Sequence, residues 1–218
     1  MYQTMAQRLY LLSYSVDKKK FELLNLQGRG QLLRAAAFAE LTFGGKLIAE
    51  GGKVVRPAVE PPSDPFLADV WHDVSADKPK GWLSLVHNKA HTAEEPVRDQ
   101  LATTYAITVR REKRFGLVPA DRVTVEDPRP VRALRDGVRD AVLRGAGHAS
   151  TSPMEEVTMA VFAAEAEVTS VFTGKERREH AQTLKALAAR VDDAVPGLRK
   201  ALRDSYLSSV VVGGGWGN

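Results

Sequence analysis

The stretch LLRAAAFAELTFGGKLIAE, residues 32–50, decides the fold of this chain. Its first half is almost entirely Ala, Leu and Phe, and apolar residues recur at i, i+3, i+4 and i+7 on most faces. This pattern predicts a helix that is buried nearly all round, with Ala side chains letting neighbouring helices approach closely. Gly44 and Gly45 are typical of a helix C-terminus, because glycine readily adopts the left-handed conformation that closes it. The rest of the chain must pack around this helix.

Two charged residues, Arg34 and Glu40, interrupt the apolar helix, and each needs a partner or a water-facing side. Just upstream, Gly28-Arg29-Gly30 forms a glycine-rich entry to the helix, and this junction carries two arginines, Arg29 and Arg34. Free amides at a helix N-terminus and nearby guanidinium groups favour an anion or phosphate site. The alternative is a flexible turn, with Arg34 in a salt bridge at the edge of the core.

Outward from the central helix, the pattern predicts mostly amphipathic helices with two hairpins. A first hairpin is expected over residues 46–56, with Gly51-Gly52 as its turn, and a longer one over residues 107–126. The Asp17-Lys18-Lys19-Lys20 run is interpreted as an exposed, solvated loop. Helices are expected at residues 6–14, 66–74, 81–90, from 94 onward, and at 130–144, 153–172, 175–191 and 196–212.

Length and composition favour one domain with a sizeable core, over residues 1–212, followed by a Gly-rich tail at 213–218. No stretch reaches the roughly 18 consecutive apolar residues of a membrane span, and the N-terminal pattern is not that of a secretion signal. The chain has no cysteine, which suits a reducing compartment, so a cytoplasmic location is expected. A net charge of +4 favours anionic surfaces if it is clustered, and the Ala- and Arg-rich usage is typical of a GC-rich bacterial genome.

Motifs for chemistry are missing from the sequence. His87 and His91 lie at i, i+4, but Asn88 stands where a metalloprotease places its glutamate, and no third ligand is evident. Gly28-Arg29-Gly30 lacks the third glycine of a dinucleotide-binding loop. There is no cysteine nucleophile and no G-x-S-x-G turn. We therefore expect a protein that is not an enzyme and has neither a metal nor a cofactor.

The long hairpin has a basic first arm, where Arg110, Arg111, Lys113 and Arg114 surround one acidic residue. A basic hairpin after helices also fits a winged-helix nucleic-acid binder, although the preceding helix offers few base-reading side chains. Beyond the basic cluster, Phe115 and Leu117 place apolar surface on a ribbon with two free edges. A third interpretation is therefore an oligomerising scaffold, with these two residues buried between chains and the arginines at the rim.

The order and spacing of several short motifs resemble the Golgi phosphoprotein 3 family. In that family an apolar helix carries an early arginine, then Glu-Leu, then a glycine and a basic residue that open a strand. The matching segments span residues 9–202 and are Leu33-Arg34, Glu40-Leu41, Gly44-Gly45-Lys46-Leu47, residues 111–117 followed by Arg122, residues 161–172 and residues 175–178. The hairpin motif, residues 111–117 followed by Arg122, resembles bacterial members in particular, so the chain is expected to be a bacterial, actinobacterial-like member.

The resemblance implies a mainly α, single helical domain, in which amphipathic helices encircle a central apolar helix and one β-hairpin projects. It also implies a peripheral protein on the cytoplasmic face of a membrane that binds phosphatidylinositol 4-phosphate or a bacterial equivalent and that self-associates. Arg34 matches the family's first-turn arginine, and Arg98 lies in the segment that carries the family's later basic pair. Asn25 stands where the family has an aromatic residue, and Glu94 and Glu95 are acidic.

From residues and resemblance together we expect a non-enzymatic protein that binds anionic phospholipid headgroups through Arg34, Arg29 and Arg98. The hairpin residues Arg110, Arg111, Lys113, Arg114, Phe115 and Leu117 are expected to face the membrane or another subunit. The nucleic-acid binder and the pure scaffold remain as alternatives.

Overall fold

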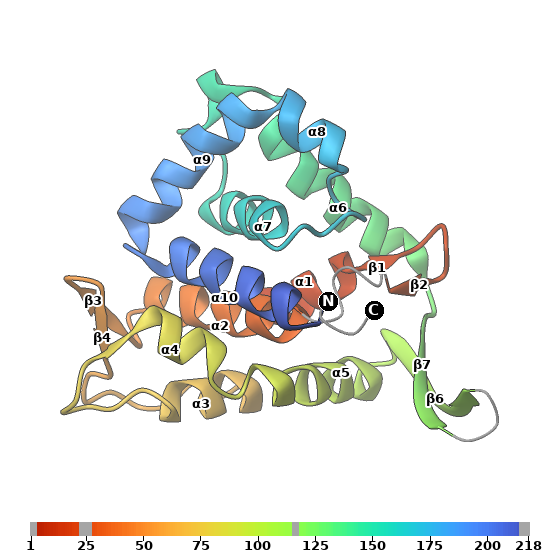
Figure 1. The fold of residues 1–218 in the computed structure, drawn as a ribbon, viewed down its shortest axis with the longest axis horizontal. Coiled ribbons are helices and arrows are strands. Elements are labelled where there is room, and N and C mark those ends of the chain that lie inside the picture. Colours follow the sequence, from red (N-terminus) through yellow and green to blue (C-terminus); the bar gives the residue numbers. More distant parts are fainter. Residues whose placement is uncertain (1–3, 22–27, 115–117, 214–218) are drawn as a thin grey trace.

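A computed structural model describes residues 4–21, 28–114 and 118–213 (Figure 1). The central helix α2 (Arg29–Phe43) has almost every residue through Ala39 buried, as its apolar pattern predicts. The flanking helices α1 (Met5–Leu12) and α10 (Leu198–Gly213) pack directly along it. The helix begins at Arg29, three residues before the predicted stretch, so Arg29 stands in its first turn.

Two groups of helices enclose this central layer (Figure 1). On one side lie α3 (Pro65–His72), α4 (Trp82–His87) and α5 (Glu94–Thr103), together with the short 3₁₀ helix η2 (Ala90–Thr92). On the other lie α6 (Pro128–Leu143), α7 (Met154–Glu165), α8 (Gly174–Glu179) and α9 (Ala181–Ala194), with η3 (Ala146–His148). The described chain is therefore mainly α-helical, as the sequence predicts.

All strand pairs are antiparallel and small. The first expected hairpin is β3 (Ile48–Glu50) and β4 (Lys53–Val55), and β5 (Lys80–Gly81) adds to β4. The second is β6 (Ile107–Arg114) and β7 (Val118–Val125), in which Val109 pairs with Val123. A further pair, β1 (Tyr14–Ser15) and β2 (Lys20–Phe21), brackets the lysine run, which the sequence interpretation treated only as a loop.

Several helix starts follow from side chains that cap them. Asp64 and Asp127 accept hydrogen bonds from amides in the first turns of α3 and α6, and a proline follows each aspartate. At α8, Thr173 and Glu176 bond reciprocally in a capping box. These caps fix where the outer helices begin and hence which faces they turn toward α2.

Two expected helices in the last third have the wrong bounds. The helix predicted at 153–172 ends at Glu165, because Glu167 adopts a left-handed backbone conformation (φ 51°) and turns the chain away. The helix predicted at 175–191 is two helices that meet at His180. Gly213, expected in the tail, still belongs to α10. Within the described ranges, no helix is long and apolar enough to cross a membrane.

Candidate functional site

The first turn of α2 carries a buried arginine with spare hydrogen-bonding capacity. The side chain of Arg29 is 1% exposed, and its Nη1 donates to Glu94 Oε1 at 2.5 Å. Its guanidinium lies over the ring of Phe21, 3.9 Å from the ring centroid. Among the described residues, its Nε and Nη2 have no hydrogen-bond partner. Buried polar groups are nearly always satisfied, so these two donors point to an acceptor such as an ordered water or an anion.

A second orphan donor lies beside Arg29. The hydroxyl of Tyr10 is buried and has no hydrogen-bond partner in the described part of the chain, and the Arg29 guanidinium lies 5.8 Å from the Tyr10 ring centroid. On the neighbouring helix α5, Glu94 and Arg98 are one turn apart, and both act electrostatically on Tyr10. We call Tyr10, Arg29, Glu94 and Arg98 the α2-start cluster. The cluster is less deeply covered at its α5 members, whose side chains are 33% and 18% exposed.

Burial decides the ionisation of Tyr10, whereas neighbouring carboxylates decide that of Arg98. Desolvation, reinforced by the charge of Glu94, raises the pKa of Tyr10 well above its ordinary value. Partial burial lowers the pKa of Arg98, but its hydrogen bond to Asp99 and the charge of Asp121 outweigh that effect and leave the pKa raised. The tyrosine is thus a neutral donor and the arginine a fixed cation at every physiological pH.

Two glycines explain how the chain reaches this geometry. A Cβ on Gly30 would lie 1.8 Å from the carbonyl oxygen of Ala90, so only glycine lets α2 approach η2 this closely. A Cβ on Gly28 would lie 2.1 Å from the ring of Tyr206 in α10. Gly28 is also the N-cap of α2 and has no side chain with which to cap the first-turn amides. The helix therefore begins with a positive dipole end beside the Arg29 guanidinium.

Arg34, the residue favoured by the family resemblance, lies elsewhere. Its side chain is buried, its Nε donates to the carbonyl oxygen of Leu85, and its Nη2 lies 3.0 Å from Asp73 Oδ2. Desolvation lowers the pKa of Arg34, while Asp73 opposes that shift. Lys89 also reaches Asp73, at 2.5 Å from Oδ1. The structure brings Arg29 and Arg98 together around Tyr10, whereas Arg34 pairs with an acid on the α3 side.

The hairpin residues are only partly within the described chain. Arg110 and Arg111 are exposed on β6, opposite Arg122 and Asp121. Lys113 and Arg114 end the same strand, and Phe115 and Leu117 lie outside the described residues. The hairpin is tied to α5 because Arg98 Nη1 donates to Asp121 Oδ2 at 2.7 Å.

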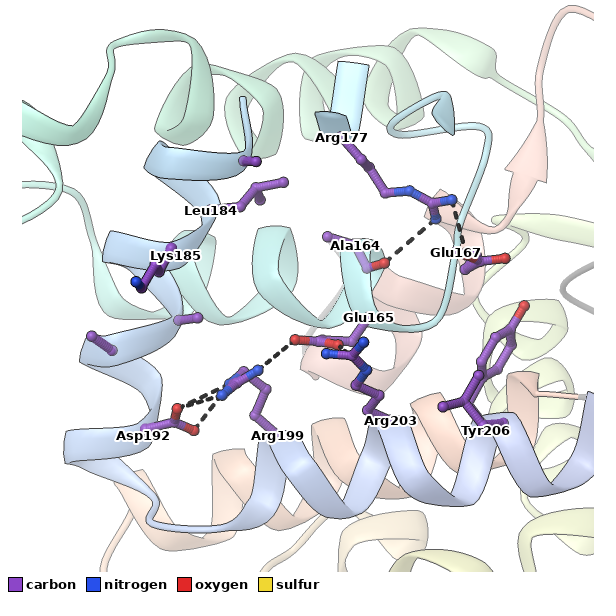
Figure 2. A pocket seen from close by; sticks show the side chains of 14 residues that line it. Ala164, Glu165, Glu167, Arg177, Leu184, Lys185, Asp192, Arg199, Arg203 and Tyr206 are labelled. Atoms are coloured by element: carbon purple, nitrogen blue, oxygen red, sulfur yellow. Dashed lines mark hydrogen bonds and ion pairs between the residues drawn. The ribbon is translucent and has the colours of Figure 1, made fainter. Parts of the chain in front are cut away.

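A cavity of about 670 Å³ lies where α7, α9 and α10 meet (Figure 2). Its charged groups are largely paired with one another: Arg199 bonds both Asp192 and Glu165, and Arg177 bonds Glu167 and the Ala164 carbonyl. Figure 2 shows these bonds as dashed lines between the labelled side chains. The bonds to Asp192 and Glu165 raise the pKa of Arg199 despite partial burial. This network stabilises the packing of three helices, and its cations are committed to it.

The histidine that the sequence offers as a metal-ligand candidate, His87, makes a contact between helices instead. His87 Nδ1 lies 3.0 Å from Ser205 Oγ, so this histidine links α4 to α10. In the parts of the chain that the structure describes, no three His, Cys, Asp or Glu side chains are grouped so as to hold a metal ion. Sequence reasoning missed Tyr10 and Glu94. Tyr10 and the residues of α5 are far apart in the sequence, and no local sequence pattern connects residues at that separation, so the sequence carries no signal for this cluster.

Comparison with known proteins gives one finding. A family model described as Golgi phosphoprotein 3 (GPP34) matches residues 5–205. No curated protein matches the chain. The matched range includes every described element from α1 to the middle of α10, and with it the whole α2-start cluster.

Proposed function

Because this chain belongs to the Golgi phosphoprotein 3 family, we propose that it is a non-enzymatic peripheral membrane protein that binds anionic phospholipid headgroups. The observation that carries the proposal is the pair of orphan donors on buried Arg29, at the uncapped start of α2. Two oxygens of one phosphate there would accept from Nε and Nη2, which is the bidentate geometry that guanidinium groups favour.

The other cluster members have distinct proposed roles. The hydroxyl of Tyr10 would donate to another oxygen of the same phosphate, and Arg98 would attract the headgroup from the less covered side. Glu94 holds the Arg29 guanidinium in place through Nη1, and Nε and Nη2 have no partner among the residues that the structure describes. Arg34 would support the site indirectly, because its bonds to Leu85 and Asp73 fix the same helix against α3 and α4.

The nucleic-acid alternative has less support. A winged helix needs a recognition helix whose exposed face meets the DNA backbone and base edges. The helix before this hairpin, α5, begins with Glu94 and Glu95, and its one arginine is bound to Asp99 and Asp121. A duplex backbone lying along this helix would meet these carboxylates, whereas a single headgroup phosphate needs to reach only the start of α2.

Vesicle flotation with the full chain tests the proposal. Vesicles of phosphatidylcholine alone are compared with vesicles that also contain phosphatidylserine or phosphatidylinositol 4-phosphate, each at low and high salt. Binding is expected only with anionic lipid and should fall steeply with salt, because screening shortens the reach of surface charge. Equal binding to neutral vesicles, or none to any, contradicts the proposal.

Two variants locate the site. Arg29→Lys keeps the charge but removes the planar fork, so it should weaken binding to the phosphomonoester lipid while salt dependence persists. Arg98→Gln should lower binding about fivefold, since a basic side chain near an anionic surface contributes about 1 kcal/mol. The matched control is Arg178→Gln, which removes one exposed charge from α8. Unchanged binding by both cluster variants would place the headgroup elsewhere.

A further inference from the structure

We infer that the β1–β2 turn and the first half of α6 form a second phosphate-binding surface, which contacts anionic lipid headgroups at the bilayer. This inference rests on the proposed function for the kind of ligand, but it concerns different residues. We call the surface the turn–α6 patch and define it by Lys18, Lys19, Lys20, Arg132 and Arg135.

The turn presents three lysines in a row. Lys18, Lys19 and Lys20 are all exposed, and they connect or begin the short strands that hold the turn in place. Lys19 has a left-handed backbone conformation (φ 51°), where glycine or asparagine would be less strained. Lys19 therefore adds a positive charge to the β1–β2 turn, although its left-handed backbone conformation costs some conformational energy.

Arginines from α6 converge on the same turn. Arg132 and Arg135 are three residues apart, so they share a helix face. Arg132 Nη2 lies 3.4 Å from Asp17 Oδ1, and Arg135 Nη1 lies 3.8 Å from Asp17 Oδ2. The two guanidinium groups thus share one small anion, the Asp17 carboxylate, and Arg135 Nε also lies 3.6 Å from Asp136 Oδ1 on its own helix. The Asp17 carboxylate is 70% exposed, so it is a weak internal competitor.

A pocket of about 190 Å³ lies at this junction. Its volume corresponds to roughly six water molecules at about 30 Å³ each, which is room for a phosphate group. Ser15 and Thr169 line it beside Arg132, Arg135 and Lys18, and its apolar lining includes Val131. Asp17 is the one carboxylate among its described lining residues, so the lining carries a net charge of about +2.

The patch continues into the α2-start cluster. Lys20 is followed in β2 by Phe21, whose ring packs edge-on against Tyr10 and under the Arg29 guanidinium. In Figure 1 the β1–β2 turn and the β6–β7 hairpin project at the same end of the long axis. The exposed lysines of the turn suit a flat anionic surface, and the pocket beside them suits one headgroup phosphate.

Vesicle flotation with two sets of variants tests the inference. Replacing Lys18, Lys19 and Lys20 with Gln should reduce binding to anionic vesicles by about 100-fold, because each of the three charges near the surface is worth about fivefold. The matched control replaces Lys175, Arg178 and Lys185, exposed cations of α8 and α9, with Gln. The melting temperatures of both triple variants are measured to check that each remains folded.

Asp17→Asn gives the sharper result. It removes the carboxylate that Arg132 and Arg135 share, while Arg135 keeps its contact with Asp136, and it should raise binding to anionic vesicles roughly fivefold. Asp193→Asn makes the same charge change at an exposed position of α9 and should have a much smaller effect. Reduced binding by the triple-lysine variant together with increased binding by Asp17→Asn supports the patch.

The outcomes separate this inference from the proposed function. If the wild-type chain binds anionic vesicles and the Arg29 and Arg98 variants weaken it, while all patch variants bind as the wild type does, the patch is refuted alone. If the patch variants alter binding and the cluster variants do not, the α2-start cluster is refuted instead. Wild-type protein that floats with no anionic vesicle overturns both. In a separate experiment, the reaction of Arg132 with an arginine-modifying reagent is compared in inorganic phosphate and in chloride of equal ionic strength. If phosphate protects Arg132 from the reagent while the patch variants float as the wild type does, the pocket binds soluble phosphate and the lipid assignment is overturned.

Discussion

The guanidinium of Arg34 lies 3.0 Å from the carboxylate of Asp73, and both side chains are largely buried. The same carboxylate binds the exposed Lys89. Arg34 is a positive charge within the apolar sequence of α2, and it is therefore neutralised by Asp73, 39 positions away. The pair joins the central helix to the segment after α3, and it sets a clear test for the role of Arg34.

Arg34→Ala is expected to lower the free energy of unfolding by about 3–5 kcal/mol, because it leaves a buried carboxylate without its main partner. Urea unfolding measures the loss. In the double variant with Asp73→Asn, the loss should be smaller than the sum of the two single losses, since the pair acts as a unit. Lys89→Gln is the control and should change stability by less than about 1 kcal/mol. A stable Arg34→Ala protein that no longer binds vesicles would instead make Arg34 a headgroup ligand.

Gly30→Ala should destabilise the protein by about 1–3 kcal/mol, because its Cβ would lie 1.8 Å from a backbone oxygen of η2 and the helices would have to separate. Gly137→Ala is the matched control in the middle of α6, where the nearest atom to a new Cβ is Glu156 Oε1 at 3.9 Å. There, alanine should stabilise the helix by about 0.5–1 kcal/mol. Equal shifts in the two melting temperatures would mean that the close contact does not determine the approach of α2 to η2.

Glu176 should make a recognisable contribution to acid unfolding. Hydrogen bonds from Arg139, opposed by some desolvation and aided by Thr173, lower the pKa of Glu176 to about 2 from an ordinary 4.5. A carboxyl group whose pKa is lowered by folding stabilises the protein fully above pH 4.5 and loses that contribution as pH falls toward 2. Urea midpoints of Glu176→Gln should therefore fall less than those of the wild type across this window. Glu179→Gln, which removes an exposed carboxylate from the same helix, should keep the wild-type profile.

The hairpin is proposed to hold subunits together through the region that includes Phe115 and Leu117. Because Val123 pairs with Val109 and is buried at the base, the deletion should remove residues 110–122 and spare that pair. A short Gly-Ser turn joining Val109 to Val123 should give a folded monomer. Multi-angle light scattering decides the matter: a wild-type chain that is monomeric at high concentration contradicts the proposal, and so does a deletion variant that stays oligomeric.

Local patterns in the sequence predicted most of the fold. The all-round apolar character of residues 32–43 predicted the buried central helix, and the alternation over residues 107–126 predicted β6 and β7. The predicted helix bounds were wrong where a single residue ends a helix although the helical spacing of apolar residues continues beyond it. Glu167 ends the turn after α7 in a left-handed conformation, and His180 separates α8 from α9, although apolar residues recur at helical spacing on both sides.

The sequence by itself determined the types of group that the candidate site contains: arginines at the entry to an apolar helix, and a run of lysines in an early turn. Only the tertiary structure decided which of them share a site. It sets Arg29 beside Tyr10 and Arg98, gives Arg34 to Asp73, and brings Arg132 and Arg135 of α6 to Asp17. The physical reason is that helical periodicity fixes which residues share a face, whereas the partner of a buried charge depends on how distant helices pack.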